Sequence, residues 1–382
     1  MSEFDDIRPY DDSEVDAVLD RVLQSDELIR AITRLRFPQA VNWLGWLLCP
    51  LVRYFLSRRA HRIHSVRQVQ EVVGELMEAM IEKQVSSFTI SGLNKLDPNC
   101  AYLFISNHRD IAMDPAFVNW ALNLQGWDTV RIAIGDNLLT KPYVSDLIRL
   151  NKSFIVKRSA PSPREKLKAS KHLSNYIHHS IANDNSHIWI AQREGRAKDG
   201  RDATNAAIIS MLALSRDKAA PYAEHIRSLN IVPVSISYEW DPCDSAKTNE
   251  VYMVREKGEY AKGEHEDVAS IARGIAGEKG AVHVAFGQML TGEFENAEQV
   301  AAEIDRQVWG NYVLHPSNHL AYEILTRKVA DFPVGAKGEK FRPDDHAAAR
   351  KKLLERVQNV PEAQRDILLH MYANPVISKQ KV

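Results

Sequence analysis

From about residue 86 onward, short apolar segments alternate with longer segments of helical character. The apolar segments are SSFTISGL (86–93), AYLFIS (101–106), VRIAIG (130–135), SFIVKR (153–158), HIWIAQ (187–192), NIVPVSISY (230–238) and AVHVAFG (281–287). Nearly continuous apolar runs are typical of strands buried on both faces, as in a parallel sheet. Strands that alternate with helices predict the α/β class, here a mostly parallel mixed sheet flanked by helices. Pro233 in the NIVPVSISY segment indicates an edge, a bulge or the start of a strand, because proline is disfavoured inside a central strand.

The chain is long enough for one large α/β domain with accessory segments. Of its 382 residues, 45% are apolar and 26% are charged, which excludes disordered, collagen-like and mucin-like chains. We predict a helical, arginine-rich segment over residues 1–85, the α/β domain over 86–335, and C-terminal helices over 336–382. The best delimited helix runs from Pro163 to about Ala182, because Ser162, Pro163 and Glu165 form a typical helix start.

Cysteine usage and the N-terminus favour a reducing, cytosolic setting. The three cysteines, Cys49, Cys100 and Cys243, are odd in number and widely spaced, so they indicate neither a disulfide framework nor a metal-ligand pair. The acidic N-terminus, MSEFDDIRPYDDSE, lacks the basic and apolar regions of a signal peptide. His61 and His64 have no third ligand nearby in the sequence, which favours a solvated helix face over a metal site.

Charge is distributed unevenly over the first 70 residues. Residues 1–27 hold ten acidic side chains and two arginines, whereas residues 28–70 hold eight arginines and no Asp or Glu. The eight are Arg30, Arg34, Arg36, Arg53, Arg58, Arg59, Arg62 and Arg67. Near an anionic leaflet each basic residue contributes on the order of 1 kcal/mol, so this cluster predicts an anionic lipid surface as a partner.

An apolar run from Val41 to Leu56 lies within this arginine-rich stretch. Asn42, Pro50 and Arg53 interrupt it, so it is too short to span a membrane, which takes about 20 mostly apolar residues. Its aromatic residues beside arginines are typical of a segment in the headgroup plane; they are Trp43, Trp46, Tyr54 and Phe55. We predict a peripheral, monotopic protein on the cytoplasmic face of a membrane. The alternative is a buried pair of helices with its arginines toward water.

The stretch ISNHRDIAMDPAF carries the predicted catalytic residues. Asn107 and His108 follow a buried strand, at the edge of the sheet where ligands bind in open α/β folds. A histidine with a carboxylate at Asp110 or Asp114 has the parts of a general base and its orienting acid. Arg109 beside it is a predicted substrate-binding residue, as is Asn107. The alternative for Asp114, which precedes Pro115, is a plain helix N-cap.

Two later strands end in basic residues. SFIVKR ends in Lys157 and Arg158, and IAQREGRAKDGR continues through Glu194, Gly195 and Arg196. If the strands are parallel, these cations lie at the same edge as His108, and guanidinium groups bind phosphate in a bidentate way. Gly195 permits a sharp turn or a close approach to a ligand. The alternative is a solvated basic loop.

In this order, NHRDIAMD, FIVKR, REGRAKDG and IVPVSISY resemble the four motifs of the glycerolipid acyltransferase family, N-H-x-x-x-x-D, F-I-x-R, x-E-G-x-R-S and V-P-V. The family includes glycerol-3-phosphate and lysophosphatidate acyltransferases, and the resemblance covers about residues 86–290. It implies a thioester donor, acyl-CoA or acyl carrier protein, with no metal and no cofactor. It also implies His108 as general base and Asp114 as its partner. The phosphate site implied consists of Arg158, Glu194, Gly195 and Arg196, with Pro233 near the acyl chain.

The chain departs from the family pattern at two places. Five residues, 109–113, separate His108 from Asp114, where the family has four. Either the loop bulges and Asp114 still reaches His108, which we favour, or Asp110 takes over the orienting role. The third motif has Gln192, Arg193 and Ala197 where the family has its usual proline and threonine or serine neighbours, and the extra positive charge indicates a different headgroup.

These features together predict an enzyme of phospholipid synthesis that acylates a hydroxyl of lysophosphatidate. Glycerol 3-phosphate and a lyso-aminolipid with a carboxylate are alternative acceptors, because arginine binds both kinds of anion. No serine or cysteine stands in a G-x-S-x-G context, which favours direct transfer over an acyl-enzyme. An alternative of another class is a catalytically idle membrane-binding module. Nucleic acid is not an expected partner.

Overall fold

Each of the seven apolar segments forms a strand in the computed structural model, which describes residues 3–139, 141–159, 161–263 and 265–382. The chain divides into two compact units. We call the first the N-terminal unit (Met1–Leu76 with Arg131–Tyr176) and the second the main unit (Met77–Val130 with Ile177–Val382). The division predicted from the sequence, into 1–85, 86–335 and 336–382, was based on function and stays a prediction.

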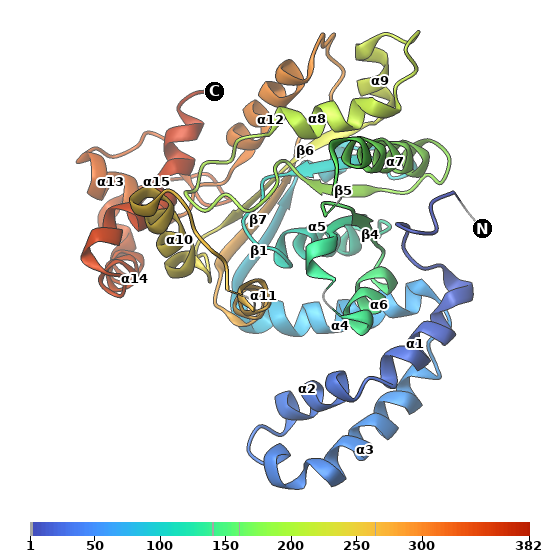
Figure 1. Ribbon diagram of the computed structural model, residues 1–382. Coiled ribbons are helices and arrows are strands. Elements are labelled where there is room, and N and C mark those ends of the chain that lie inside the picture. The colour runs from blue at the N-terminus through green and yellow to red at the C-terminus, as the bar shows by residue number, and fades with distance from the viewer. Residues whose placement is uncertain (1–2, 140, 160, 264) are drawn as a thin grey trace. The chain divides into compact units, whose positions relative to one another are not determined.

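The sheet of the main unit is mixed and mostly parallel (Figure 1). Its strands are β1 (Val85–Ser91), β7 (Gly280–Phe286), β6 (Ile231–Tyr238), β2 (Leu103–Ser106) and β5 (Ile188–Ala191), in that spatial order. The pairs β1·β7, β6·β2 and β2·β5 are parallel, and β6·β7 is antiparallel. The predicted α/β class, with its mostly parallel mixed sheet, is therefore confirmed.

Strand β2 occupies a central position in this sheet. Ile105 is in register with Ile190 of β5 on one side and with Pro233 of β6 on the other. Every residue of β2 is buried, which explains its uninterrupted apolar sequence. Because β2, β5 and β6 run in the same direction, the segments that follow them emerge at one edge, where ligands bind in such sheets.

Pro233 lies in β6, which is paired on both sides rather than at the edge. Its carbonyl accepts a hydrogen bond from Gly287 N (2.8 Å), beyond the last residue of β7. The antiparallel pairing with β7 begins only at Val234, opposite Phe286. The proline therefore precedes the stretch that is paired with β7 and lies near the start of the strand, which is a position where proline is tolerated.

Helices cover this sheet and continue beyond it. The helices between the strands of the main unit are α5 (Met113–Leu124), α8 (Ala206–Leu212), α9 (Tyr222–Ser228), α10 (Asp244–Lys257), α11 (Glu266–Ala276) and α12 (Ala297–Asn311). Helix α5 packs against β7, and α12 packs against β6 and α8.

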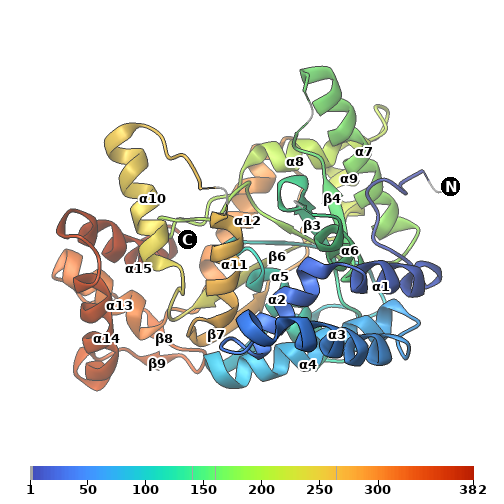
Figure 2. The same ribbon diagram turned by 60° about the horizontal axis from the view of Figure 1, so that its bottom comes forward.

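The predicted C-terminal helices are present and form a cluster with its own core (Figure 2). Helices α13 (Pro316–Thr326), α14 (Ala347–Gln358) and α15 (Arg365–Lys379) pack together, with the short strands β8 (Pro333–Val334) and β9 (Glu339–Lys340) between α13 and α14 in the chain. Helix α15 also contacts α10, so the C-terminal cluster is part of the main unit.

The N-terminal unit is mostly helical. It contains α1 (Val15–Leu23), α2 (Asp26–Arg36), α3 (Val41–Ala60), the parallel strands β3 (Arg131–Gly135) and β4 (Ser153–Val156), and α6 (Pro142–Leu150). The division between the units falls within α4 (Val66–Gln84) and α7 (Pro163–Ala182). Val15, Val18, Val22 and Leu150 form a small core. Ser25 lies between α1 and α2, and its hydroxyl accepts from Leu28 N and caps α2.

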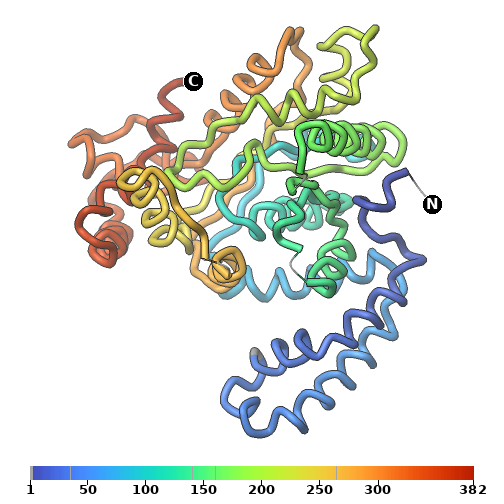
Figure 3. The backbone as a smooth tube through the Cα atoms, in the orientation of Figure 1, coloured from blue at the N-terminus to red at the C-terminus, as the bar shows by residue number. Residues whose placement is uncertain are grey.

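Helix α3 runs alongside α2 and α1 (Figure 3). It spans 20 residues and continues through Pro50. Much of its apolar surface is exposed, including Trp43 (70% exposed) and Trp46 (76%). Among the described residues, no helix is both long and apolar enough to cross a bilayer.

Candidate active site

His108 lies in the loop that connects the buried strand β2 to α5. Its side chain is 14% exposed, and its Nδ1 lies 2.8 Å from Oδ2 of Asp114, which is fully buried. Because a carboxylate accepts, this contact assigns the proton to Nδ1 and leaves Nε2 as the nitrogen that can take a proton. The indole of Trp189 in β5 lies edge-on to the imidazole, with 6.1 Å between the ring centroids. The pair has the geometry of a general base with an orienting acid.

The Asp114 carboxylate is held by donors from both sides. Its Oδ2 also accepts from the backbone N–H groups of Arg109 (2.6 Å) and Asp110 (2.9 Å), and its Oδ1 accepts from the hydroxyl of Tyr238 (2.6 Å). Hydrogen bonds from this many donors fix the orientation of a carboxylate anion. Such an anion stabilises an imidazolium that forms at His108.

The extra residue between His108 and Asp114 is accommodated at the start of α5. There Oδ1 of Asp110 accepts from the N–H groups of Ala112 (3.0 Å) and Met113 (2.9 Å). Of the two carboxylates, Asp114 therefore contacts the imidazole, while Asp110 accepts from backbone N–H groups where the helix begins. Burial and the neighbouring Asp114 raise the pKa of Asp110. Since α5 begins at Met113, Asp114 lies in its first turn and is not the N-cap considered above.

The side chain of Arg109 is bound inside the protein. It forms two hydrogen bonds to Asp202, from Nε to Oδ1 (2.9 Å) and from Nη2 to Oδ2 (2.6 Å), and a third to the carbonyl of Gly200 (3.1 Å). The guanidinium also stands 5.6 Å from the ring centroid of Tyr312. Through these contacts Arg109 connects the His108 loop to the loop that follows β5, and its predicted role in binding substrate stays a prediction.

Asn107 likewise has internal partners. Its amide donates to the carbonyl of Ile236 (2.9 Å) and accepts from the N–H of Ile236 (2.8 Å), so it extends the pairing of β2 with β6 by one step. The side chain is fully buried. The structure therefore assigns it a role in holding the sheet edge, and the predicted contact of Asn107 with substrate remains untested.

The loop after β5 brings a second cation to the same region. The N–H of Ala197 donates to the carbonyl of His108 (2.7 Å), which fixes the two loops side by side. Gly195 adopts a left-handed conformation (φ 72°), and Glu194 and Gly195 are exposed. Arg196 is only 8% exposed and donates to the hydroxyl of Ser270 in α11 (3.4 Å). Within the described residues it has no carboxylate partner, so this largely buried cation is available to an anionic group.

Lys157 and Arg158 lie just after β4 in the N-terminal unit. Lys157 forms an ion pair with Asp6, and the N–H of Arg158 donates to Oδ1 of Asp136 (3.2 Å). Both partners belong to the same unit. The predicted contribution of Lys157 and Arg158 to substrate binding stays a prediction.

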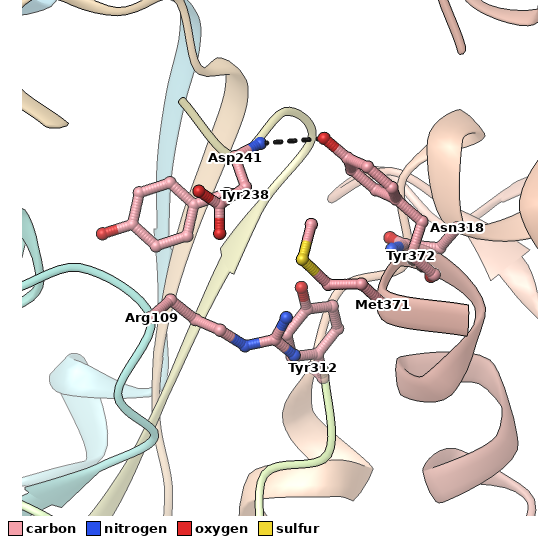
Figure 4. A pocket seen from close by; sticks show the side chains of 7 residues that line it. All are labelled: Arg109, Tyr238, Asp241, Tyr312, Asn318, Met371 and Tyr372. Carbon is pink, nitrogen blue, oxygen red and sulfur yellow. Dashed lines mark hydrogen bonds between the residues drawn. The ribbon is translucent and has the colours of Figure 1, made fainter. Parts of the chain in front are cut away.

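A small cavity adjoins the His108 loop (Figure 4). It is lined by Arg109, Tyr238, Asp241, Tyr312, Asn318, Met371 and Tyr372. Its C-terminal wall is α15, from which the hydroxyl of Tyr372 accepts from Asp241 N (3.2 Å) and donates to Oδ2 of Asp244 (2.8 Å). The cavity is small, and several of its lining side chains are hydrogen bonded within the protein.

Sequence analysis missed three side chains that contact the site: Tyr238, Asp202 and Ser270. Tyr238 could have been found, because it is a polar residue at the carboxyl end of a buried strand. Asp202 and Ser270 follow only from tertiary contacts. Among the described residues, no cluster of His, Cys, Asp or Glu side chains could hold a metal ion.

Comparisons with known proteins give one family match and one structural match. Residues 87–237 match the family model described as Acyltransferase. This range includes His108, Asp114 and Arg196, and it ends one residue before Tyr238. The crystal structure of the 1-acyl-sn-glycerophosphate (LPA) acyltransferase PlsC from Thermotoga maritima is similar at 14% identity and a TM-score of 0.35, over 74% of this chain and 95% of that chain. No curated protein matches the sequence.

Proposed function

We propose that this chain, whose residues 87–237 match the family model described as Acyltransferase, transfers a fatty acyl group from a thioester to a hydroxyl of lysophosphatidate, a step of phospholipid synthesis. The donor is acyl-CoA or acyl carrier protein. One observation carries the proposal: the His108–Asp114 pair lies beside a loop whose Arg196 is buried and has no carboxylate partner in the part of the chain that the structure describes. A base for a hydroxyl and a cation for an anionic headgroup then share one region of the main unit.

The reaction proceeds by direct transfer within a ternary complex. Nε2 of His108 takes the proton of the acceptor hydroxyl while its oxygen bonds to the thioester carbonyl carbon. Backbone N–H groups stabilise the oxyanion of the tetrahedral intermediate, and Asp114 stabilises the imidazolium. The C–S bond then breaks, the carbonyl re-forms as an ester, and the departing sulfur takes the proton from the imidazolium.

The acceptor follows from the chemistry of Arg196. A guanidinium forms two parallel hydrogen bonds to a phosphate, and a buried one binds it more strongly than a solvated one. Glycerol 3-phosphate satisfies the same requirement, and a lyso-aminolipid offers a carboxylate in its place. Arg193 and Lys198 add charge to the loop, but Lys198 is paired with Glu250 of α10. Lysophosphatidate is our choice, because it also supplies an acyl chain that an interfacial enzyme meets in the membrane.

Thiol release from acyl-CoA tests the function directly. We expect release with lysophosphatidate, a lower rate with glycerol 3-phosphate, and little with a lyso-aminolipid or a neutral monoacylglycerol. Acyl carrier protein loaded with the same chain is the second donor. Absence of release from both donors with every acceptor would contradict the proposal and favour the idle membrane-binding module.

Replacing Arg196 with alanine should raise KM for lysophosphatidate about 10- to 100-fold, because hydrogen bonds between charged groups contribute roughly 1.5–3 kcal/mol. Steady-state thiol release at varied acceptor concentration measures this. Arg201→Ala is the matched control, since Arg201 belongs to the same loop but is largely exposed. An unchanged KM in Arg196→Ala would show that this cation is outside the headgroup site.

We further propose that the N-terminal unit docks on an anionic membrane surface through α3. Trp43, Trp46 and Phe55 are exposed, and such side chains lower their free energy in the interfacial layer. Several exposed arginines on α2, in the last turn of α3 and just after α3 have no carboxylate partner among the described residues; they are Arg30, Arg34, Arg36, Arg58 and Arg62. These cations add attraction to anionic lipids.

Flotation with vesicles tests the docking. Trp43→Ala combined with Trp46→Ala should weaken binding to vesicles of mixed neutral and anionic lipid by about 10- to 100-fold, as expected for two large apolar side chains withdrawn from the interface. Leu354→Ala on α14 is the control, because it removes an exposed apolar side chain from the main unit. Equal flotation of the double variant and the wild type would contradict a role for α3.

A further inference from the structure

Tyr238 is the last residue of β6 and contacts the carboxylate that holds the candidate base. Its hydroxyl donates to Oδ1 of Asp114 (2.6 Å), while Oδ2 of the same carboxylate receives His108 Nδ1 and two backbone N–H groups. Tyr238 is therefore the donor that the structure gives to the oxygen facing away from the histidine. Nothing in the catalytic pair itself requires it.

Packing and burial hold the ring of Tyr238 in place independently of its hydrogen bond. It packs edge-on against Phe117 of α5, with 5.7 Å between the centroids, and is 6% exposed. Burial and the neighbouring carboxylates of Asp114 and Asp110 raise the pKa of Tyr238 well above its ordinary value. The hydroxyl thus keeps its proton and acts as a donor throughout the working pH range.

A neutral donor differs from a cation at this position. Lysine or arginine at Oδ1 would offset the negative charge of Asp114 and weaken its attraction for an imidazolium. The phenol of Tyr238 donates a hydrogen bond to Oδ1 of Asp114 and fixes the plane of the carboxylate. Because the phenol is neutral, it does not offset the negative charge that faces His108. The nearby cations are bound elsewhere: Arg109 to Asp202, and Lys247 to Asp241 and to the carbonyl of Arg109.

We infer that Tyr238 is a positioning residue for the acyl transfer proposed above, acting on His108 only through Asp114. Without its hydroxyl, Oδ1 of a fully buried carboxylate has no donor, and the carboxylate can rotate so that its remaining donors are shared between both oxygens. The imidazole then loses its fixed orientation, while the acceptor and donor sites are untouched. This inference rests on the proposed function.

The conservative variant Tyr238→Phe keeps the ring and removes one donor. We expect kcat to fall about tenfold, the equivalent of one hydrogen bond to a charged group, with KM for both substrates unchanged within about twofold. Tyr102→Phe is the matched control, because Tyr102 is also a buried tyrosine of the main unit and its hydroxyl accepts from Asp97 N at 2.9 Å. A kcat for Tyr238→Phe equal to that of Tyr102→Phe would overturn the inference.

A double-variant comparison tests whether Tyr238 acts through Asp114. Adding Tyr238→Phe to Asp114→Asn should cause no further loss of kcat/KM, since the carboxylate it positions is already gone. A further tenfold loss would show an independent role and overturn the inference.

A spectroscopic measurement keeps the inference separate from the proposed function. In the free protein, the Nδ1–H of His108 bonded to Asp114 should give a low-field proton resonance, assigned by its absence in His108→Ala. Tyr238→Phe should shift or broaden this resonance, and Tyr102→Phe should not. An unchanged resonance in Tyr238→Phe would refute the positioning role, whether or not the wild type is active. Absence of thiol release by the wild type would refute only the proposed function.

Discussion

His108→Ala should lower kcat/KM for acyl transfer by about 10²- to 10⁴-fold, the range that general base catalysis contributes. The acceptor hydroxyl is a weak nucleophile, and in this variant water would have to take its proton. The orienting carboxylate remains in place, because Asp114 still accepts from Tyr238 and from the N–H groups of Arg109 and Asp110. KM should change little, since the proposed phosphate contact is made by Arg196. Thiol release under saturating donor and acceptor measures the effect.

The control for this variant is another histidine beside an aspartate. His370 of α15 lies 3.3 Å from Asp366 and is largely exposed, so His370→Ala removes a similar pair that has no part in the proposed chemistry. It should retain wild-type kcat/KM. Both variants should show unchanged thermal unfolding, because His108 is a loop residue with a partly exposed side chain. A His108→Ala protein with near wild-type turnover would remove the base from the mechanism.

The fold was predictable because its strands are local in sequence. The run AYLFIS contains the fully buried strand β2. Polar and apolar residues do not alternate in it, because the strand is buried on both faces. The boundaries of α7 came from Ser162, Pro163 and Glu165, which are local signals for a helix start. The mixed character of the sheet depends on one antiparallel pair, β6·β7, whose direction no single strand sequence determines.

The candidate site was predictable only in part. The His108–Asp114 contact could be anticipated, because both residues belong to one loop and its following helix turn. Their flanking residues could not be assigned in the same way. Asn107 is hydrogen bonded to Ile236 and Arg109 to Asp202, and these partners lie about a hundred residues further along the chain. Whether a polar side chain at a strand end contacts substrate or the protein depends on partners that are distant in the sequence. The local sequence does not identify these partners.

Asp202→Ala should reduce the free energy of unfolding of the main unit by about 3–5 kcal/mol, the usual cost of removing one partner of a buried ion pair. Asp202 is 3% exposed and Arg109 is 7% exposed, and two hydrogen bonds join them. In the variant the Arg109 guanidinium would stay buried beside Tyr312, with the carbonyl of Gly200 as its remaining acceptor. Urea unfolding followed by circular dichroism measures the change, and Glu303→Ala, which breaks the more exposed pair with Arg306, should cost at most about 1 kcal/mol.

The stability of a second variant shows whether the loss in Asp202→Ala comes from the unpaired charge or from lost packing. Arg109→Met combined with Asp202→Leu removes both charges while keeping apolar volume, and such replacements are often neutral or stabilising. We therefore expect the double variant to recover most of the stability lost in Asp202→Ala. It should nevertheless transfer acyl groups poorly, because Arg109 would no longer attach the His108 loop to Gly200 and Asp202. A double variant as unstable as Asp202→Ala would mean that shape, and not the unpaired cation, dominates at this position. Full activity in the double variant would show that the arginine contributes to stability alone.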